Sequence, residues 1–202
     1  KLPLAKSSEL DSAYSVSMTG VDRFINRELS WLAFNERVLE EAANIRHPVL
    51  ERIRFLSISA TNLDEFYMVR VAGLKAHMAG GVTTSSQDGM TPAQQLIAIN
   101  LRAGRLMTQQ QEIWRSLQRP LRDAGIAVLA PEELTVSEGD WLEQHFLSDI
   151  FPVLTPLAVD PAHPFPFLPN LGFAIVLQLT RGADGKELIG ILPLPSQISR
   201  FI

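Results

Sequence analysis

Residues 57–70 read SISATNLDEFYMVR and lie inside a longer segment, residues 48–78, that has the pattern of an amphipathic helix. Apolar side chains recur in this segment at spacings of three and four, which places them on one face of a helix. This first stripe comprises Leu50, Ile53, Leu56, Ala60, Leu63, Tyr67, Val71, Leu74 and Met78. Pro48 suits a first helical turn, and Gly80 with Gly81 supplies a stop. The pattern therefore predicts one long helix over residues 48–78.

Asn62 lies on the opposite side of this predicted helix. At about 100° per residue, it points roughly 200° away from Ala60. A second stripe on that side comprises Phe55, Ile58, Ser59, Asn62, Phe66 and Val69. A helix that is apolar on two faces needs neighbours on both, and Asn62 places an uncharged amide within one of these faces.

Two interpretations account for this amide. A buried asparagine can be satisfied by a neighbouring backbone group and fix the register of packed helices. Alternatively, its donors and its acceptor can read the edge of a planar ligand held between apolar side chains. The residue pattern leaves both interpretations open.

The rest of the chain predicts a mainly α fold. Helices over residues 21–45 and from Thr91-Pro92 to about Pro120 flank the long central helix, so an antiparallel bundle of long helices is expected. Residues 79–89 form a flexible connection in this prediction.

The character of the sequence changes at Gly125, where a partial α+β domain is expected to begin. Its predicted elements are a strand over residues 126–130, a helix over 137–151, an irregular proline-rich segment over 156–169, and strands over 172–179 and 188–192 joined at Asp184-Gly185. We therefore expect a flexible tail over residues 1–20, a helical domain over residues 21–125 and a partial head domain over residues 126–202.

Composition limits the function. The chain has 202 residues, of which 46% are hydrophobic, a net charge of −4 and no cysteine. A nucleic-acid-binding role is disfavoured by the acidic balance, and thiolate metal sites and cysteine nucleophiles are excluded. A transmembrane segment is not predicted, because no apolar run in the sequence approaches the length of about 20 residues that spans a bilayer. A soluble cytoplasmic protein is expected. The chain begins with Lys1 instead of methionine, which suggests part of a longer protein.

No constellation of catalytic residues emerges. The histidines are His47, His77, His145 and His163, and none of them forms a close helical pair of the kind that binds metals. Asp64 and Glu65 are adjacent on a helix and diverge by about 100°, so they do not converge on one ion. Gly182 to Lys186 is too short for a phosphate-binding loop. The sequence therefore predicts no catalytic residue and no metal ligand.

Three segments carry a resemblance to a known family. They are ELSWLAFNERVL at residues 28–39, RIRFL at residues 52–56 and NLDEFYMVR at residues 62–70. Together they resemble the amino-terminal domain of bacterial polyphosphate kinase. The resemblance covers nearly the whole chain after about residue 22, and residues 125–202 are similar to the start of the family's head domain.

The resemblance implies a nucleotide site. In the family, the asparagine of NLDEFY contacts ATP, and the amino-terminal helical domain forms one wall of the adenine pocket. Asn62 is thereby implied as the ATP-binding residue. Phe66, one turn away, and Arg70 are secondary candidates, through base stacking and phosphate contact.

The resemblance also implies where the chemistry lies. The family passes the terminal phosphate of ATP to a histidine in carboxy-terminal domains, which makes it a phosphoprotein, and then to a growing polyphosphate chain. Magnesium ligands belong to those domains too, so residues 1–202 alone are expected to be inactive. A homo-oligomer formed through the head domain is implied, and a peripheral position at the membrane stays open. The alternative is a non-catalytic helical scaffold or oligomerisation module in which Asn62 binds no ligand.

Overall fold

The computed structural model describes residues 20–159, 165–182 and 184–202. The chain divides into two compact units, Lys1–Ala127 and Val128–Ile202, and each unit is described by itself. The tail predicted over residues 1–20 lies, apart from Gly20, outside the described residues.

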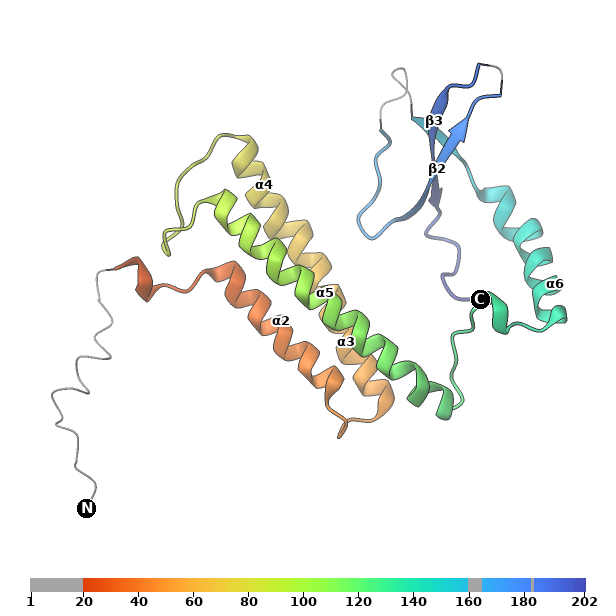
Figure 1. Ribbon diagram of the computed structural model, residues 1–202, viewed down its shortest axis with the longest axis horizontal. Helices are drawn as coiled ribbons and strands as arrows, with labels where there is room; N and C mark the ends of the chain where they lie inside the picture. Colours follow the sequence, from red (N-terminus) through yellow and green to blue (C-terminus); the bar gives the residue numbers. More distant parts are fainter. Residues whose placement is uncertain (1–19, 160–164, 183) are drawn as a thin grey trace. The chain divides into compact units, whose positions relative to one another are not determined.

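Long helices form the first unit (Figure 1). They are α2 (Arg27–Ala43), α3 (Val49–Phe66) with its continuation through the π-helical turn η2 (Tyr67–Val71) into α4 (Ala72–Ala79), and α5 (Pro92–Asp123). The short turn between α2 and α3 reverses the chain, and α5 packs against both helices. The predicted antiparallel bundle is confirmed.

The core of this unit lies between the three helices. Its fully buried apolar side chains include Leu32 of α2, Phe66 of α3 and Ile99 of α5. Burying each such side chain contributes about 1.5–3 kcal/mol, so these contacts supply most of what holds the bundle together. The central helix buries Ser59, Leu63, Phe66 and Val71, which combines residues from both predicted stripes into one buried face.

Side-chain caps determine where α2 and α5 begin. A short 3-10 turn, η1 (Val21–Arg23), precedes α2. The α-helix begins only after Asn26, because Asn26 Oδ1 accepts hydrogen bonds from the backbone N–H groups of Glu28 and Leu29 and caps the helix there. The first helix is thus shorter than predicted, and Ile25 lies outside it with 82% of its surface exposed. The predicted start of α5 is confirmed by a capping box between Thr91 and Gln94.

The second unit combines one helix with a small sheet. Its helical elements are η3 (Pro131–Glu133), α6 (Val136–His145), the π turn η4 (Phe146–Ile150) and η5 (Phe151–Val153). The strands β1 (Leu157–Val159), β2 (Phe173–Thr180) and β3 (Glu187–Leu194) form an antiparallel sheet in the order β1-β3-β2. The predicted hairpin is confirmed: Gly185 takes a φ of 68° where β2 turns into β3.

Two predictions for residues 126–202 were wrong, one of a strand and one of an irregular segment. Residues 126–130 form no strand: they connect the two units, and the N–H of Ile126 bonds back to Leu121 at the end of α5. The proline-rich segment over residues 156–169 contains β1 instead. Pro156 precedes that strand, so its missing N–H falls outside the ladder that pairs Leu157 with Ile191.

Within the described ranges, every helix is too short or too polar to cross a bilayer.

Candidate functional site

Asn62 lies on α3 where that helix faces α2. Its side chain is half-buried, and Asn62 Nδ2 donates to Asn35 Oδ1 of α2 over 3.3 Å. Asn35 is completely buried. The amide singled out by the sequence therefore meets a second amide from the neighbouring helix.

These amides belong to a network that joins all three helices. Asn35 Nδ2 donates to the backbone oxygen of Ser59 over 2.9 Å, and Gln110 Nε2 of α5 donates to Ser59 Oγ, also over 2.9 Å. Each buried side-chain polar atom in the described residues has a partner. A satisfied polar network in an apolar interface fixes how the helices meet, because a shifted register would leave its members unpaired.

An aromatic group supports the next turn of α3. Phe66 is 1% exposed and stacks on Trp31 with ring centroids 4.7 Å apart, while the rings of Phe66 and Tyr67 form a T-shaped pair with centroids 6.1 Å apart. The Tyr67 hydroxyl donates to Asn100 of α5, and burial raises the pKa of Tyr67. Phe66 therefore faces the core and offers no open ring face to a ligand, whereas Asn62 reaches the surface.

The π turn changes which side chains reach the core after Phe66. Counted from Phe66, an uninterrupted α-helix would bring Arg70 and Gly73 to the buried side, although the stripe counted from Leu63 already passes through Val71. The π turn inserts one residue, so Val71 is buried and Arg70 turns outward with 38% of its side chain exposed. Arg70 Nη1 lies 4.0 Å from Glu28 Oε1, a loose pair that leaves the guanidinium accessible.

Glu36 and Arg102 form a strong ion pair between α2 and α5. Arg102 Nε donates to Glu36 Oε1 over 2.7 Å, Arg102 Nη2 donates to Oε2, and Nη1 donates to the backbone oxygen of Leu29 over 3.1 Å. These hydrogen bonds lower the pKa of Glu36, and the carboxylate raises the pKa of Arg102. All of this guanidinium's contacts are structural, so it is not a candidate for phosphate binding.

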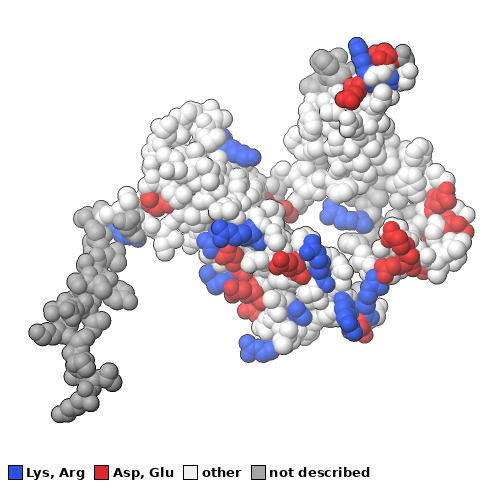
Figure 2. Space-filling view, viewed as in Figure 1, with Lys and Arg blue, Asp and Glu red and all other residues white. Residues whose placement is uncertain are grey.

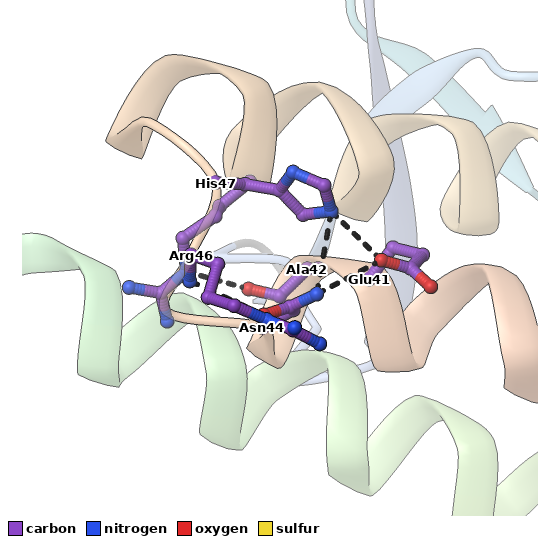
Figure 3. A network of polar contacts seen from close by, with 6 residues as sticks. Glu41, Ala42, Asn44, Arg46 and His47 are labelled. Carbon is purple, nitrogen blue, oxygen red and sulfur yellow. Dashed lines mark hydrogen bonds and ion pairs between the residues drawn. The ribbon is translucent and has the colours of Figure 1, made fainter.

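Another polar cluster lies at the turn between α2 and α3 (Figure 3). His47 Nε2 lies 2.7 Å from Glu41 Oε2, and Asn44 Nδ2 donates to the same oxygen over 3.2 Å. These contacts, the one from His47 first, lower the pKa of Glu41. Arg52 Nε donates to the backbone oxygen of Ala42 over 2.9 Å. The cluster closes the carboxyl end of α2 and accounts for both Arg52 and His47.

The remaining candidates from the sequence are surface residues. Glu51 and Arg54 pair at 3.7 Å along α3, as their spacing predicts. Asp64 and Glu65 are exposed. His145 stacks on Trp141 and lies 2.8 Å from Asp149. In the described ranges, no three His, Asp or Glu side chains come together to hold a metal ion.

A shallow groove between α2 and α5 does not suit a nucleotide. Its lining comprises Glu36, Leu39, Glu40, Ala43, Gln109, Glu112 and Ile113. Three carboxylates would repel a triphosphate. Figure 2 shows basic and acidic side chains interspersed over the visible face of the bundle, which gives that face no single-sign field.

Sequence reasoning missed Asn35, Gln110 and the π turn. Asn35 lies three residues after Leu32 and four before Leu39, both buried, so helical spacing could have identified it as a second amide on an apolar face. Gln110 likewise follows Leu106 by four residues on the buried face of α5. No sequence signal distinguishes the π turn, because Val71 also fits an uninterrupted helical stripe.

Comparison with known proteins gives a consistent result. Residues 24–129 match the family model described as polyphosphate kinase N-terminal domain, and residues 137–202 match the polyphosphate kinase middle domain. A crystal structure of polyphosphate kinase from Porphyromonas gingivalis superposes with a TM-score of 0.67 at 31% identity, over 85% of this chain and 25% of that chain.

Curated relatives agree. The polyphosphate kinase of Erythrobacter litoralis is 48% identical over 200 residues, which are 99% of this chain and 27% of that protein. The polyphosphate kinase of Mycobacterium avium is 44% identical over 182 residues, which are 90% of this chain and 25% of that protein. The chain spans about a quarter of the length of the curated relatives it matches. With both family models matched in order along the bundle and the sheet-containing unit, the chain belongs to the polyphosphate kinase family and carries its N-terminal and middle domains.

Proposed function

We propose that the full-length protein transfers the terminal phosphate of ATP to a growing polyphosphate chain through a phosphohistidine that lies outside residues 1–202. The described residues supply no converging set of cations and metal for the transferring phosphoryl group, and no cluster that fits Mg²⁺. The magnesium that this chemistry uses is therefore assigned to other parts of the protein. In this proposal residues 1–202 alone turn over no ATP.

The contribution of this chain is the adenine-side wall of the ATP site. The observation that carries this proposal is the position of Asn62: it is half-buried and donates one N–H to Asn35. No residue in the part of the chain that the structure describes donates to Asn62 Oδ1. An amide that is anchored on one side and has a free acceptor on the other suits the edge of a base. Arg70, accessible two turns along the helix, is the secondary contact, to phosphate.

The test is polyphosphate synthesis by the full-length protein with Asn62→Ala. A several-fold rise in KM for ATP is expected, because an interaction with the bound nucleotide is lost. Gln110→Ala is the matched control. It breaks another hydrogen bond of the same network, the one that Gln110 Nε2 of α5 donates to Ser59 Oγ, 51 residues earlier in the sequence. An unchanged KM for ATP in Asn62→Ala would contradict the site.

A second candidate is a helical scaffold in which Asn62 only fixes the register of the bundle. The network of Asn62, Asn35, Ser59 and Gln110 favours it, since every bond in that network is internal. It predicts that Asn62→Ala lowers the free energy of unfolding by about 1–3 kcal/mol while ATP kinetics stay unchanged. Self-association as a homo-oligomer belongs to both candidates and is measured by light scattering of the full-length protein.

A further inference from the structure

The orientation of the Asn62 amide is determined by groups that lie beneath it. Ser59 contributes a backbone oxygen, which can only accept a hydrogen bond. The side-chain atom of Asn35 that lies 2.9 Å from this oxygen must therefore be Nδ2. Because Asn35 is completely buried, no water can take over this bond.

This fixed orientation is passed on to Asn62. With Asn35 Nδ2 on Ser59, Asn35 Oδ1 faces Asn62 at 3.3 Å and needs a donor. Asn62 satisfies it only by presenting Nδ2. The flipped amide would bring two oxygens together and leave a buried acceptor unpaired, which is costly in an apolar interface. Asn62 Oδ1 is consequently turned away from Asn35.

We propose that Asn35 is a positioning residue that holds the oxygen of Asn62 toward the nucleotide, and that this makes the site prefer adenine over guanine. The inference rests on the proposed function of Asn62. Adenine carries an amino donor at N6 beside a ring-nitrogen acceptor, which an amide oxygen and its remaining N–H complement. Guanine carries the acceptor O6 at that position. A fixed oxygen repels O6, whereas an amide free to rotate could present its N–H to it.

The experiment compares ATP with GTP as phosphate donor for the full-length protein. The readout is the ratio of kcat/KM for the two nucleotides, which a purely structural defect would leave unchanged. In Asn35→Ala, Asn62 loses its anchor, and the ratio is expected to fall about tenfold toward GTP. Asn35→Ser, whose hydroxyl is too short to bridge Ser59 and Asn62, gives the same result should the alanine variant fail to fold.

Two further variants separate positioning from stability. Asn35→Asp keeps an oxygen facing Asn62, so this variant should retain the wild-type preference for ATP. It should nevertheless lower the melting temperature, because it loses the N–H that donates to the backbone oxygen of Ser59. Gln110→Ala removes the other bond at Ser59 and should also lower the melting temperature without changing the nucleotide ratio. A loss of preference in Asn35→Ala with retention in these two variants supports the inference.

The outcomes distinguish this inference from the proposed function. If Asn62→Ala raises KM for ATP but Asn35→Ala and Asn35→Ser keep the wild-type nucleotide ratio, Asn62 binds ATP and the positioning role of Asn35 is wrong. If Asn62→Ala leaves KM for ATP unchanged, the proposed site fails, and the inference fails with it.

Discussion

Asn62 makes a structural hydrogen bond, and we propose a nucleotide contact for its oxygen, so one substitution would remove both. Its N–H satisfies the oxygen of Asn35, which is buried, and its own oxygen is free among the described residues. Truncating the side chain therefore leaves an acceptor unpaired and costs about 1–3 kcal/mol, whether or not a nucleotide binds. A lower melting temperature in Asn62→Ala does not by itself decide between ligand and scaffold. KM for ATP does.

The ion pair of Glu36 and Arg102 makes a prediction about pH. Arg102 holds the pKa of Glu36 below its ordinary value of 4.5. A lowered folded-state pKa contributes stability that is fully present above the unfolded pKa and is lost as the pH falls through the folded pKa. Glu36→Gln should therefore lower the free energy of unfolding by about 1 kcal/mol at pH 7, a modest amount because both side chains are about one-third exposed.

Urea unfolding at a series of pH values checks this prediction. The difference between wild type and Glu36→Gln should be constant near neutral pH and shrink below pH 4.5. Glu51→Gln is the control, since the pair of Glu51 and Arg54 is looser and more exposed, and its loss should change stability little. A Glu36→Gln effect that persisted unchanged in acid would mean that packing, not charge, links these helices.

At the scale of elements, the π turn η2 joins α3 to α4, and the buried side chains before it and at its end face the same core. Phe66 directly precedes the turn and Val71 is its last residue, and both are buried although they lie five positions apart in the chain. Deleting Val69, which is 61% exposed, should convert the turn to α-helix and still leave Val71 and Leu74 facing the core. Circular dichroism should show retained helicity and a modest fall in melting temperature.

The matched control is a deletion in the regular part of α3. Removing the exposed Thr61 rotates Leu63 and Phe66 by about 100° relative to the preceding turns and takes them off the core. This variant should unfold the bundle. If both deletions lowered the stability equally, the π turn would not contain an inserted residue that the helix can lose, and the prediction would be wrong.

The elements that sequence predicts well are those whose signals are local. The three and four spacing along α5, the helix start at Thr91-Pro92 and the turn at Asp184-Gly185 each depend on residues close together in the chain, and each was confirmed. The contact between Asn35 and Asn62 joins residues 27 apart, and only tertiary packing brings them together. Strand β1 is only three residues long, and it is a strand because it pairs with β3, which lies far along the chain.

At the scale of the whole molecule, the two units differ in how much core they contain. The bundle buries a continuous set of apolar side chains from three helices. Within the described residues of the second unit, Ile191 is the apolar side chain that is fully buried, while Trp141, Phe173 and Val176 are more than half exposed. Hydrophobic burial provides most of the stability of a folded unit, so the second unit should open far more easily than the bundle.

Hydrogen exchange measured by mass spectrometry tests this difference. The amides of β2 and β3 in the 202-residue chain should exchange about a hundredfold faster than those at the centres of α3 and α5. In the full-length protein, protection of β2 and β3 should rise, because we expect the rest of the protein to cover the exposed apolar side chains of the sheet, while α3 and α5 should change little. Exchange in β2 and β3 that stayed equally fast would mean that this apolar surface is left uncovered, and the sheet would then be marginally stable in the full-length protein as well.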